Sequence, residues 1–212
     1  LCVQARAVGG DYYDFLSCGP GRLGLVLGDI SGKGMPAALL MANLQGNLRS
    51  QYAATWNDPK RLLQSVNRLF HENSIDNSYA TLFFGEYDDR TRRLRYANCG
   101  HYAPLLMREN GNVERLESTG TVLGLFEEFE CEVDEKQLRS GDTLVLFTDG
   151  VTESFDVHGE EFGEDKLTDS LRRNLTQPVD AILKCVVDDV KSFSPLEQHD
   201  DITLIVAKCE GE

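Results

Sequence analysis

The sequence predicts an α+β fold in which two packed, mainly antiparallel β-sheets form a β-sandwich flanked by pairs of helices. Three observations lead to this fold class: β-rich runs follow one another in series, helical patterns come in pairs, and 41% of the 212 residues are hydrophobic. We find no internal repeat and no convincing linker, so we expect a single domain over residues 1–212. Because the chain begins at Leu1, without a Met and in what resembles the middle of a strand, we also expect it to be cut from a longer protein.

The chain is expected to open with a buried strand and two helices. Residues 24–30 (GLVLGDI) are short, apolar and β-rich, which is typical of a buried strand. Pro36 suits the first turn of a helix, and apolar residues then recur at helical spacing as far as about Ser50. Asp58 and Pro59 are typical of an N-cap and a first helical residue, and they predict a second helix that ends near Asn73.

The middle of the chain has the period of strands, and its end returns to helices before a last strand. Asn110-Gly111 predicts a β-hairpin turn between two of these strands. The expected strands are residues 79–87, 93–98, 103–108, 113–116, 128–133, 142–148 and 202–208, and the further helices are residues 164–174 and 178–192.

Charge and composition narrow the classes of partner. The formal net charge is −14, from 35 acidic and 21 basic residues, which repels nucleic acid. No run reaches the roughly 18 apolar residues of a membrane helix, and we expect no direct membrane contact by this domain. The six cysteines contain no C-x-x-C pair and indicate reduced thiols in a cytoplasm rather than a disulfide framework or a zinc site.

The glycine-rich stretch GDISGKGMP could suggest a loop that binds the phosphates of a nucleotide. Such a loop requires G-x-x-x-x-G-K followed by Ser or Thr, whose hydroxyl binds magnesium. Here Gly28 and Gly32 are too close together, and Gly34 follows Lys33. The stretch therefore does not fit a nucleotide loop, and its aspartate becomes the feature to explain.

Aspartates lie at the edges of apolar strands in four separate segments. Asp29 ends a buried strand, Asp149 ends the strand in LVLFTDG, Asp200 and its neighbour precede the last strand, and Asp11 lies in VGGDYYDF. A carboxylate there is costly to bury unless it is paired or binds a metal. Each one alone could be a turn or capping aspartate, but together they predict a site for Mg²⁺ or Mn²⁺, which prefer oxygen ligands.

Five motifs in order now make the chain recognisable: VGGDYYDF, GDISGKGMPAALLM, NCGH, LFTDGVTE and DDITLIVAK. From about Val8 to Lys208 the chain resembles the bacterial metal-dependent serine phosphatases. They form the branch of the protein phosphatase 2C-like (PPM) superfamily typified by stage II sporulation protein E and the sigma-B regulator phosphatases. The resemblance implies a β-sandwich flanked by helices and two Mn²⁺ or Mg²⁺ ions. It also implies hydrolysis of phosphoserine or phosphothreonine by a water or hydroxide held between the ions.

Carried over motif by motif, the resemblance implies the residues of the site. Asp29 matches the bridging metal ligand, and the backbone carbonyl of Ile30 matches a further ligand. Asp149 and Asp200 match the other ligands, and Asp11 matches a carboxylate that orients metal-bound water or ligates directly.

Other polar residues near these motifs have two alternative roles each. Asp201 is expected to act as a second shell or a cap, and Lys33 either is solvated or screens the phosphate of the substrate. His101 in NCGH either braces the edge of a sheet or supports the site, and Glu153 either touches a third ion or caps a turn. His199 is either a loop histidine or a supporting residue.

Two further residues complete the predicted site. Asp14 is expected to hydrogen-bond locally. Ser31 stands where eukaryotic members of the superfamily carry a histidine assigned as general acid, so the acid for the leaving group stays unassigned.

The resemblance also implies a partner, a phosphorylated anti-sigma-factor antagonist of the STAS type, and an upstream sensor or receiver module in the same chain. Two alternatives stay open. A non-catalytic pseudophosphatase that only binds its phosphoprotein would have lost metal aspartates, whereas all four segments keep theirs. A metal-dependent nucleotide hydrolase would need a base or ribose pocket, which the sequence does not reveal.

Overall fold

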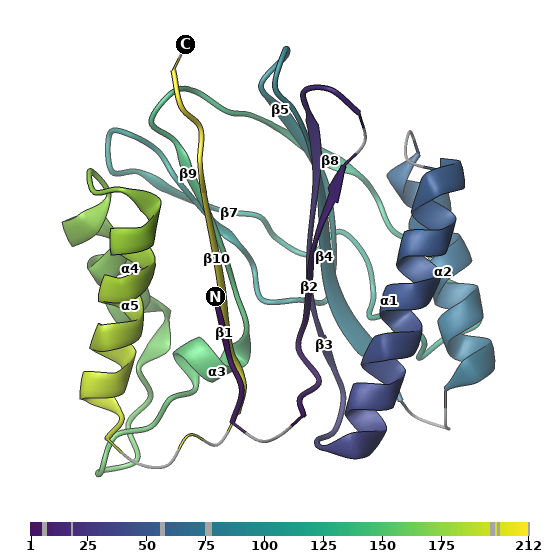
Figure 1. The fold of residues 1–212 in the computed structure, drawn as a ribbon, viewed down its shortest axis with the longest axis horizontal. Coiled ribbons are helices and arrows are strands. Elements are labelled where there is room, and N and C mark those ends of the chain that lie inside the picture. Colours follow the sequence, from purple (N-terminus) through teal and green to yellow (C-terminus); the bar gives the residue numbers. More distant parts are fainter. Residues whose placement is uncertain are drawn as a thin grey trace. The chain divides into compact units, whose positions relative to one another are not determined.

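The computed structural model describes the chain except for residues 6–7, 18, 56–57, 75–77, 196–197, 199 and 212 and the side chains of residues 53 and 54. The chain separates into two compact units, each described here by itself (Figure 1). Unit 1 comprises Leu1–Ala7, Pro104–Leu116 and Arg139–Glu212, and unit 2 comprises Val8–Ala103 and Glu117–Leu138.

Unit 2 is built on a five-stranded antiparallel sheet with the order β2-β3-β4-β5-β8. Its strands are β2 (Tyr12–Ser17), β3 (Arg22–Ile30), β4 (Ala80–Asp88), β5 (Arg93–Cys99) and β8 (Asp134–Gln137). Side chains of β2 alternate between buried and exposed, as expected for an edge strand with one covered face. The apolar run of β3 is buried from Gly24 to Gly28, which confirms the first predicted strand.

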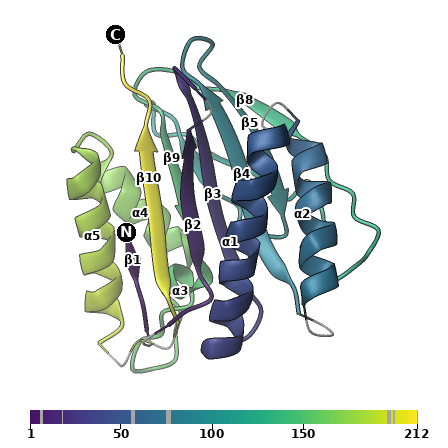
Figure 2. The same ribbon diagram turned by 45° about the vertical axis from the view of Figure 1, so that its right-hand side comes forward.

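Two helices, α1 (Met35–Thr55) and α2 (Pro59–Asn73), cover one face of this sheet (Figures 1 and 2). Leucines of α1 and apolar residues of α2 pack with β2, β3 and β4 in one hydrophobic cluster. Asp58 caps α2 as predicted, because its carboxylate accepts a hydrogen bond from the Arg61 backbone N–H at 3.1 Å. Pro59 is the first residue of α2, and the helix ends at Asn73.

Gly46 of α1 offers a simple stability test. It is exposed, and a Cβ added there would have no described atom within 4 Å. Gly46→Ala is therefore expected to raise the free energy of unfolding by about 0.5–1 kcal/mol, because alanine restricts the unfolded chain more than glycine does. Urea denaturation would measure the change, and a loss of stability would contradict the open surface at this position.

Unit 1 is built on a second five-stranded antiparallel sheet with the order β1-β10-β9-β6-β7. Its strands are β1 (Cys2–Val3), β6 (Leu105–Met107), β7 (Val113–Arg115), β9 (Thr143–Phe147) and β10 (Ile202–Lys208). The short helix α3 (Asp149–Thr152) follows β9, and the longer α4 (Gly163–Asn174) and α5 (Val179–Phe193) cover one face of the sheet. The predicted fold of two antiparallel sheets with paired helices is thus confirmed.

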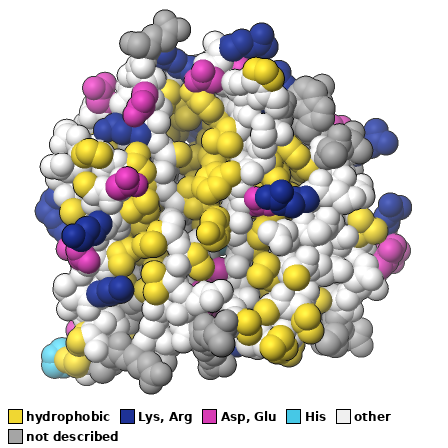
Figure 3. All heavy atoms as spheres, viewed as in Figure 1, with side chains coloured by type: hydrophobic (Ala, Val, Ile, Leu, Met, Phe, Trp, Pro, Cys, Tyr) yellow, Lys and Arg dark blue, Asp and Glu magenta, His cyan; other side chains and the backbone are white. Residues whose placement is uncertain are grey.

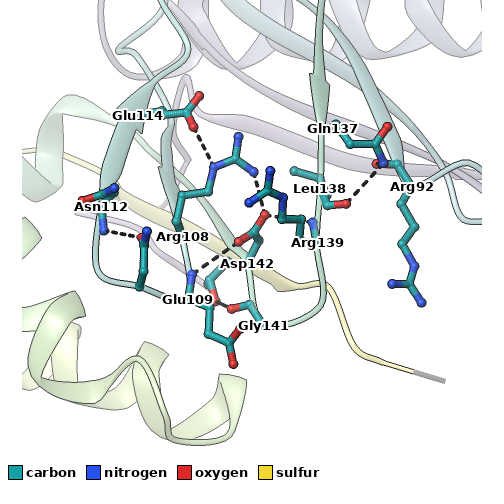
Figure 4. Close-up of polar contacts among 12 residues, drawn as sticks. Arg92, Arg108, Glu109, Asn112, Glu114, Gln137, Leu138, Arg139, Gly141 and Asp142 are labelled. Atoms are coloured by element: carbon teal, nitrogen blue, oxygen red, sulfur yellow. Dashed lines mark hydrogen bonds and ion pairs between the residues drawn. The ribbon is translucent and has the colours of Figure 1, made fainter.

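The hairpin between β6 and β7 is anchored by an ion-pair network (Figure 4). Gly111 has φ +85°, the left-handed conformation that the predicted Asn110-Gly111 turn requires. The Arg108 guanidinium donates hydrogen bonds to Glu114 and to Asp142, both at 2.6 Å. Since Asp142 is 2% exposed and lies directly before β9, these bonds tie the hairpin to the neighbouring strand.

One predicted strand is wrong. Residues 128–133 alternate as a strand does, and Phe129 and Cys131 are indeed buried. Yet only Cys131 makes a bridge, an isolated one to Gly120, and the strand that pairs with β5 begins later, at Asp134. The alternation of apolar and polar residues reflects which side chains are buried, whereas a strand also needs a hydrogen-bonded partner backbone along its length.

Surface and composition add two findings. Met35 and Leu39 are exposed at the N-terminal end of α1, where Figure 3 shows hydrophobic side chains at the surface. Across the described ranges, none of the helices has the length and apolar character that crossing a membrane demands. Five cysteines are free thiols, and Cys18 lies outside the described residues.

Candidate metal centre

In unit 2, Asp11 and Asp29 lie side by side. The β2–β3 register places Asp11 opposite Asp29, one residue beyond the last pair of the ladder. A Cβ added to Gly10 would lie 3.2 Å from the Asp29 carboxylate Oδ1 and 3.1 Å from the carbonyl oxygen of Ile30. The chain just before Asp11 therefore approaches the predicted bridging carboxylate and the predicted carbonyl ligand so closely that a side chain there would crowd both.

The loop after β3 turns through two glycines. Gly32 and Gly34 have φ values of +98° and +74°, which glycine adopts without strain. The backbone conformation, and not a close contact, favours glycine here, because a Cβ at either position would meet no described atom within 4 Å. Lys33 lies between them with its side chain exposed.

Ser31, which stands where eukaryotic members carry a histidine, is hydrogen-bonded to the backbone of Tyr79. Its hydroxyl accepts a hydrogen bond from the Tyr79 backbone N–H at 2.9 Å, and its own N–H donates to the Tyr79 carbonyl at 2.9 Å. These two bonds hold the end of β3 against the start of β4, next to Asp29.

In unit 1, the loops that carry Asp149 and Asp200 touch. Asp149 begins α3 directly after β9, and Asp200 precedes β10, the antiparallel neighbour of β9. A Cβ added to Gly150 would lie 2.0 Å from the carbonyl oxygen of Asp201 and 3.4 Å from the carbonyl carbon of Asp200. Only glycine permits this approach, which brings the two predicted ligands to one end of the β9–β10 pair.

Neighbouring aspartates in the last motif have different surroundings. Asp201 is 5% exposed, and its carboxylate accepts a hydrogen bond from the Ala5 backbone N–H at 2.8 Å. Asp200 is half-buried, and its Oδ1 accepts the Asp201 backbone N–H at 2.9 Å. Because the Asp201 carboxylate is directed to the N-terminal segment, this arrangement favours Asp200 as the ligand.

His101 is a buried and braced histidine of unit 2. Its backbone N–H donates to the Asn98 side chain at 2.8 Å, and its Nδ1 lies 2.9 Å from the hydroxyl of Thr81. Thr81 is paired with Asp29 in the β3–β4 ladder, so one residue separates His101 from the predicted bridging ligand. The contacts agree with a bracing role, and support of the metal site stays a prediction.

The remaining candidates are placed as follows. Glu153 is the C-cap of α3, and its backbone N–H donates to the carbonyl of Asp149 at 2.6 Å. Asp14 hydrogen-bonds locally as expected, because it accepts from the Tyr12 hydroxyl at 2.8 Å. It also accepts from the guanidinium of Arg49, which is 35 residues away in the sequence, at 2.7 Å. Burial and the hydrogen bond to Asp14 raise the pKa of the Tyr12 phenol. His199 lies outside the described residues.

Each unit supplies oxygen donors of the kind that a hard divalent cation prefers. Unit 2 supplies Asp11, Asp29 and the Ile30 carbonyl, and unit 1 supplies Asp149 and Asp200; all four carboxylates are half-buried. Within the described part of the chain, no three His, Cys, Asp or Glu side chains are grouped closely enough to hold an ion. The structure thus shows two pairs, and their joining into one site stays a prediction.

Two glycines, one beside each pair of aspartates, were not predicted as part of the site. Gly10 precedes Asp11 and Gly150 follows Asp149, so both were visible in the sequence as a glycine adjacent to a predicted ligand. The hydrogen bond from Ala5 to Asp201 was not predicted either, and the sequence carries no signal for it.

The chain is similar in sequence and in fold to known bacterial proteins. RsbU, a phosphoserine phosphatase of Bacillus subtilis, is 29% identical over 209 residues, which cover 98% of this chain and 62% of RsbU. The RsbU and RsbW domain structure of Rv1364c from Mycobacterium tuberculosis superposes with a TM-score of 0.81 at 28% identity, covering 96% of this chain and 56% of that one. The structure of the SiaA-PP2C domain of Pseudomonas aeruginosa superposes with a TM-score of 0.89 at 22% identity, and the match covers 98% of this chain and 84% of that one.

The fold is therefore that of the PP2C-like phosphatase domains. The family model of stage II sporulation protein E (SpoIIE) matches residues 19–210, and the chain belongs to this family. The chain spans about three fifths of the length of RsbU, since it covers 62% of that protein.

Proposed function

We propose that this chain is a metal-dependent protein phosphatase that hydrolyses phosphoserine or phosphothreonine. One observation carries the proposal: four strand-end carboxylates lie in two pairs, with the close approach of Gly10 beside one pair and of Gly150 beside the other. Membership of the SpoIIE family and the likeness to RsbU, a phosphoserine phosphatase, support the same activity.

We propose that two Mn²⁺ or Mg²⁺ ions bind to Asp11, Asp29, Asp149, Asp200 and the Ile30 carbonyl. Bound ions of this kind lower the pKa of water and offset negative charge on a phosphoryl group. The chain itself holds the carboxylates in place through the β2–β3 register and the contact of Gly150 with Asp201. Lys33, exposed in the adjoining loop, would balance part of the charge of an approaching phosphate.

For the substrate, we propose a phosphorylated STAS-type antagonist of an anti-sigma factor, and for the longer protein an upstream sensor or receiver module. Support comes from the five motifs and from Rv1364c, a protein that combines an RsbU domain with an RsbW domain. We further propose a cytoplasmic location, which agrees with the free thiols of the described cysteines.

The proposal is tested by phosphate release from a phosphoserine-bearing STAS-domain protein in the presence of Mn²⁺. We expect release that stops when EDTA removes the metal. Nucleoside triphosphates and cyclic nucleotides form the comparison: faster hydrolysis of these would favour a nucleotide hydrolase. Binding of the phosphoprotein without release would instead favour a pseudophosphatase.

A further inference from the structure

The N-terminal segment, residues 1–5, is bound along the strand that follows Asp200. Leu1 exchanges two backbone hydrogen bonds with Leu204, each 2.9 Å long. Next along the segment, β1 pairs with β10 in antiparallel register, with Val3 opposite Ile202. The segment therefore runs toward the loop of the predicted ligand Asp200.

Two side chains of that loop hold the segment where the ladder ends. The Gln198 side-chain amide donates to the carbonyl of Val3 at 2.8 Å and to the carbonyl of Asp200 at 2.7 Å. Asp201 directly precedes Ile202, the ladder partner of Val3, and its carboxylate accepts a hydrogen bond from the backbone N–H of Ala5 at 2.8 Å. Ala5 and Asp201, which are 196 residues apart in the sequence, are thus hydrogen-bonded directly beside the predicted metal ligand Asp200.

Asp201 is a junction of three segments. Its side chain binds Ala5, and its backbone N–H donates to the carboxylate of Asp200 at 2.9 Å. Its carbonyl oxygen accepts a hydrogen bond from the Thr148 hydroxyl at 3.3 Å and is also the atom that Gly150 approaches. Thr148 and Gly150 are the residues directly before and after Asp149. A carboxylate that is 5% exposed is costly unless it is hydrogen-bonded, so its orientation is strongly determined.

From this geometry we infer that Asp201 is a positioning residue that couples the N-terminal segment to the metal ligands Asp149 and Asp200. Displacing Ala5 leaves the Asp201 carboxylate without this donor, and both ligand loops are attached to Asp201. The inference rests on the proposed metal site. Mutation of a residue that hydrogen-bonds to a metal ligand commonly weakens metal binding by about 10–100-fold, although that residue does not touch the ion.

The test measures Mn²⁺ affinity by the electron paramagnetic resonance signal of free Mn²⁺, without turnover. Asp201→Ala is expected to weaken binding by about 10–100-fold, whereas Asp201→Asn should restore most of the affinity because its amide oxygen still accepts a hydrogen bond. Ala5→Pro removes the donor from the other side and is expected to weaken binding as well.

Asp156→Ala is the matched control in the same unit. The Asp156 carboxylate also accepts backbone N–H groups, from His158 and Glu160, at 2.8 and 2.9 Å, in a loop without predicted ligands. Its removal should leave Mn²⁺ affinity at the wild-type value. Thermal unfolding in EDTA identifies any variant that does not fold, and if Asp201→Ala does not, Ala5→Pro decides.

Coupling must also work in reverse, because linkage between two sites is reciprocal. Adding Mn²⁺ is expected to slow hydrogen exchange at the Ala5 amide in the wild type and not in Asp201→Ala. Wild-type affinity in folded Asp201→Ala and Ala5→Pro would overturn the coupling. If Asp149→Ala also bound Mn²⁺ normally, the proposed metal site itself would fail; if only Asp149→Ala lost binding, the coupling alone would fail.

Discussion

Asp149→Ala is expected to weaken Mn²⁺ binding by at least about 100-fold and to stop phosphate release from a phosphoserine protein. Changes around a metal ligand cost up to about 100-fold in affinity, so the loss of a ligand itself should cost at least as much. Asp149 is half-buried at the start of α3, and Gly150 brings its loop against the loop of Asp200. Mn²⁺ titration and phosphate release on one preparation would measure both effects.

The matched control for this variant is Asp180→Ala. Asp180 lies in the first turn of α5 and is exposed, so its removal deletes one negative charge without touching either carboxylate pair. Weaker Mn²⁺ binding in both variants would point to the overall charge of the protein. Unchanged binding and release in Asp149→Ala would remove this residue from the site.

Gly150→Ala is expected to lower the free energy of unfolding by about 1–3 kcal/mol and to weaken Mn²⁺ binding by at least about tenfold. Its Cβ would lie 2.0 Å from the carbonyl oxygen of Asp201, a backbone atom that can move only with β10. Relief of this overlap must separate the Asp149 loop from the Asp200 loop. Urea denaturation and Mn²⁺ titration would follow the two consequences.

Gly46→Ala is the control that isolates the close approach. Both glycines lie in helices, where alanine is the better helix former, but a Cβ at Gly46 meets open space. We therefore expect the two substitutions to change stability in opposite directions. A stabilised Gly150→Ala with normal Mn²⁺ affinity would show that the loops of Asp149 and Asp200 need not touch.

Local patterns carried much of the fold. The start of the helix at Pro59 was predicted correctly and its end was predicted near Asn73, because its N-cap and its first-turn proline are adjacent in the chain and act within one turn. The Asn110-Gly111 turn was equally local. The aspartates were visible too, since a carboxylate at the end of an apolar run is unusual wherever the run packs.

The sequence by itself thus determined the antiparallel α+β class, the helices α1, α2, α4 and α5 and the order of the aspartates, because period, caps and turns act over a few residues. Tertiary structure alone decided that β8 begins at Asp134, that Gly150 contacts Asp201 and that Asp201 holds Ala5. A strand ladder and a close approach both need a partner backbone that is remote along the chain. No periodicity records which remote backbone that is.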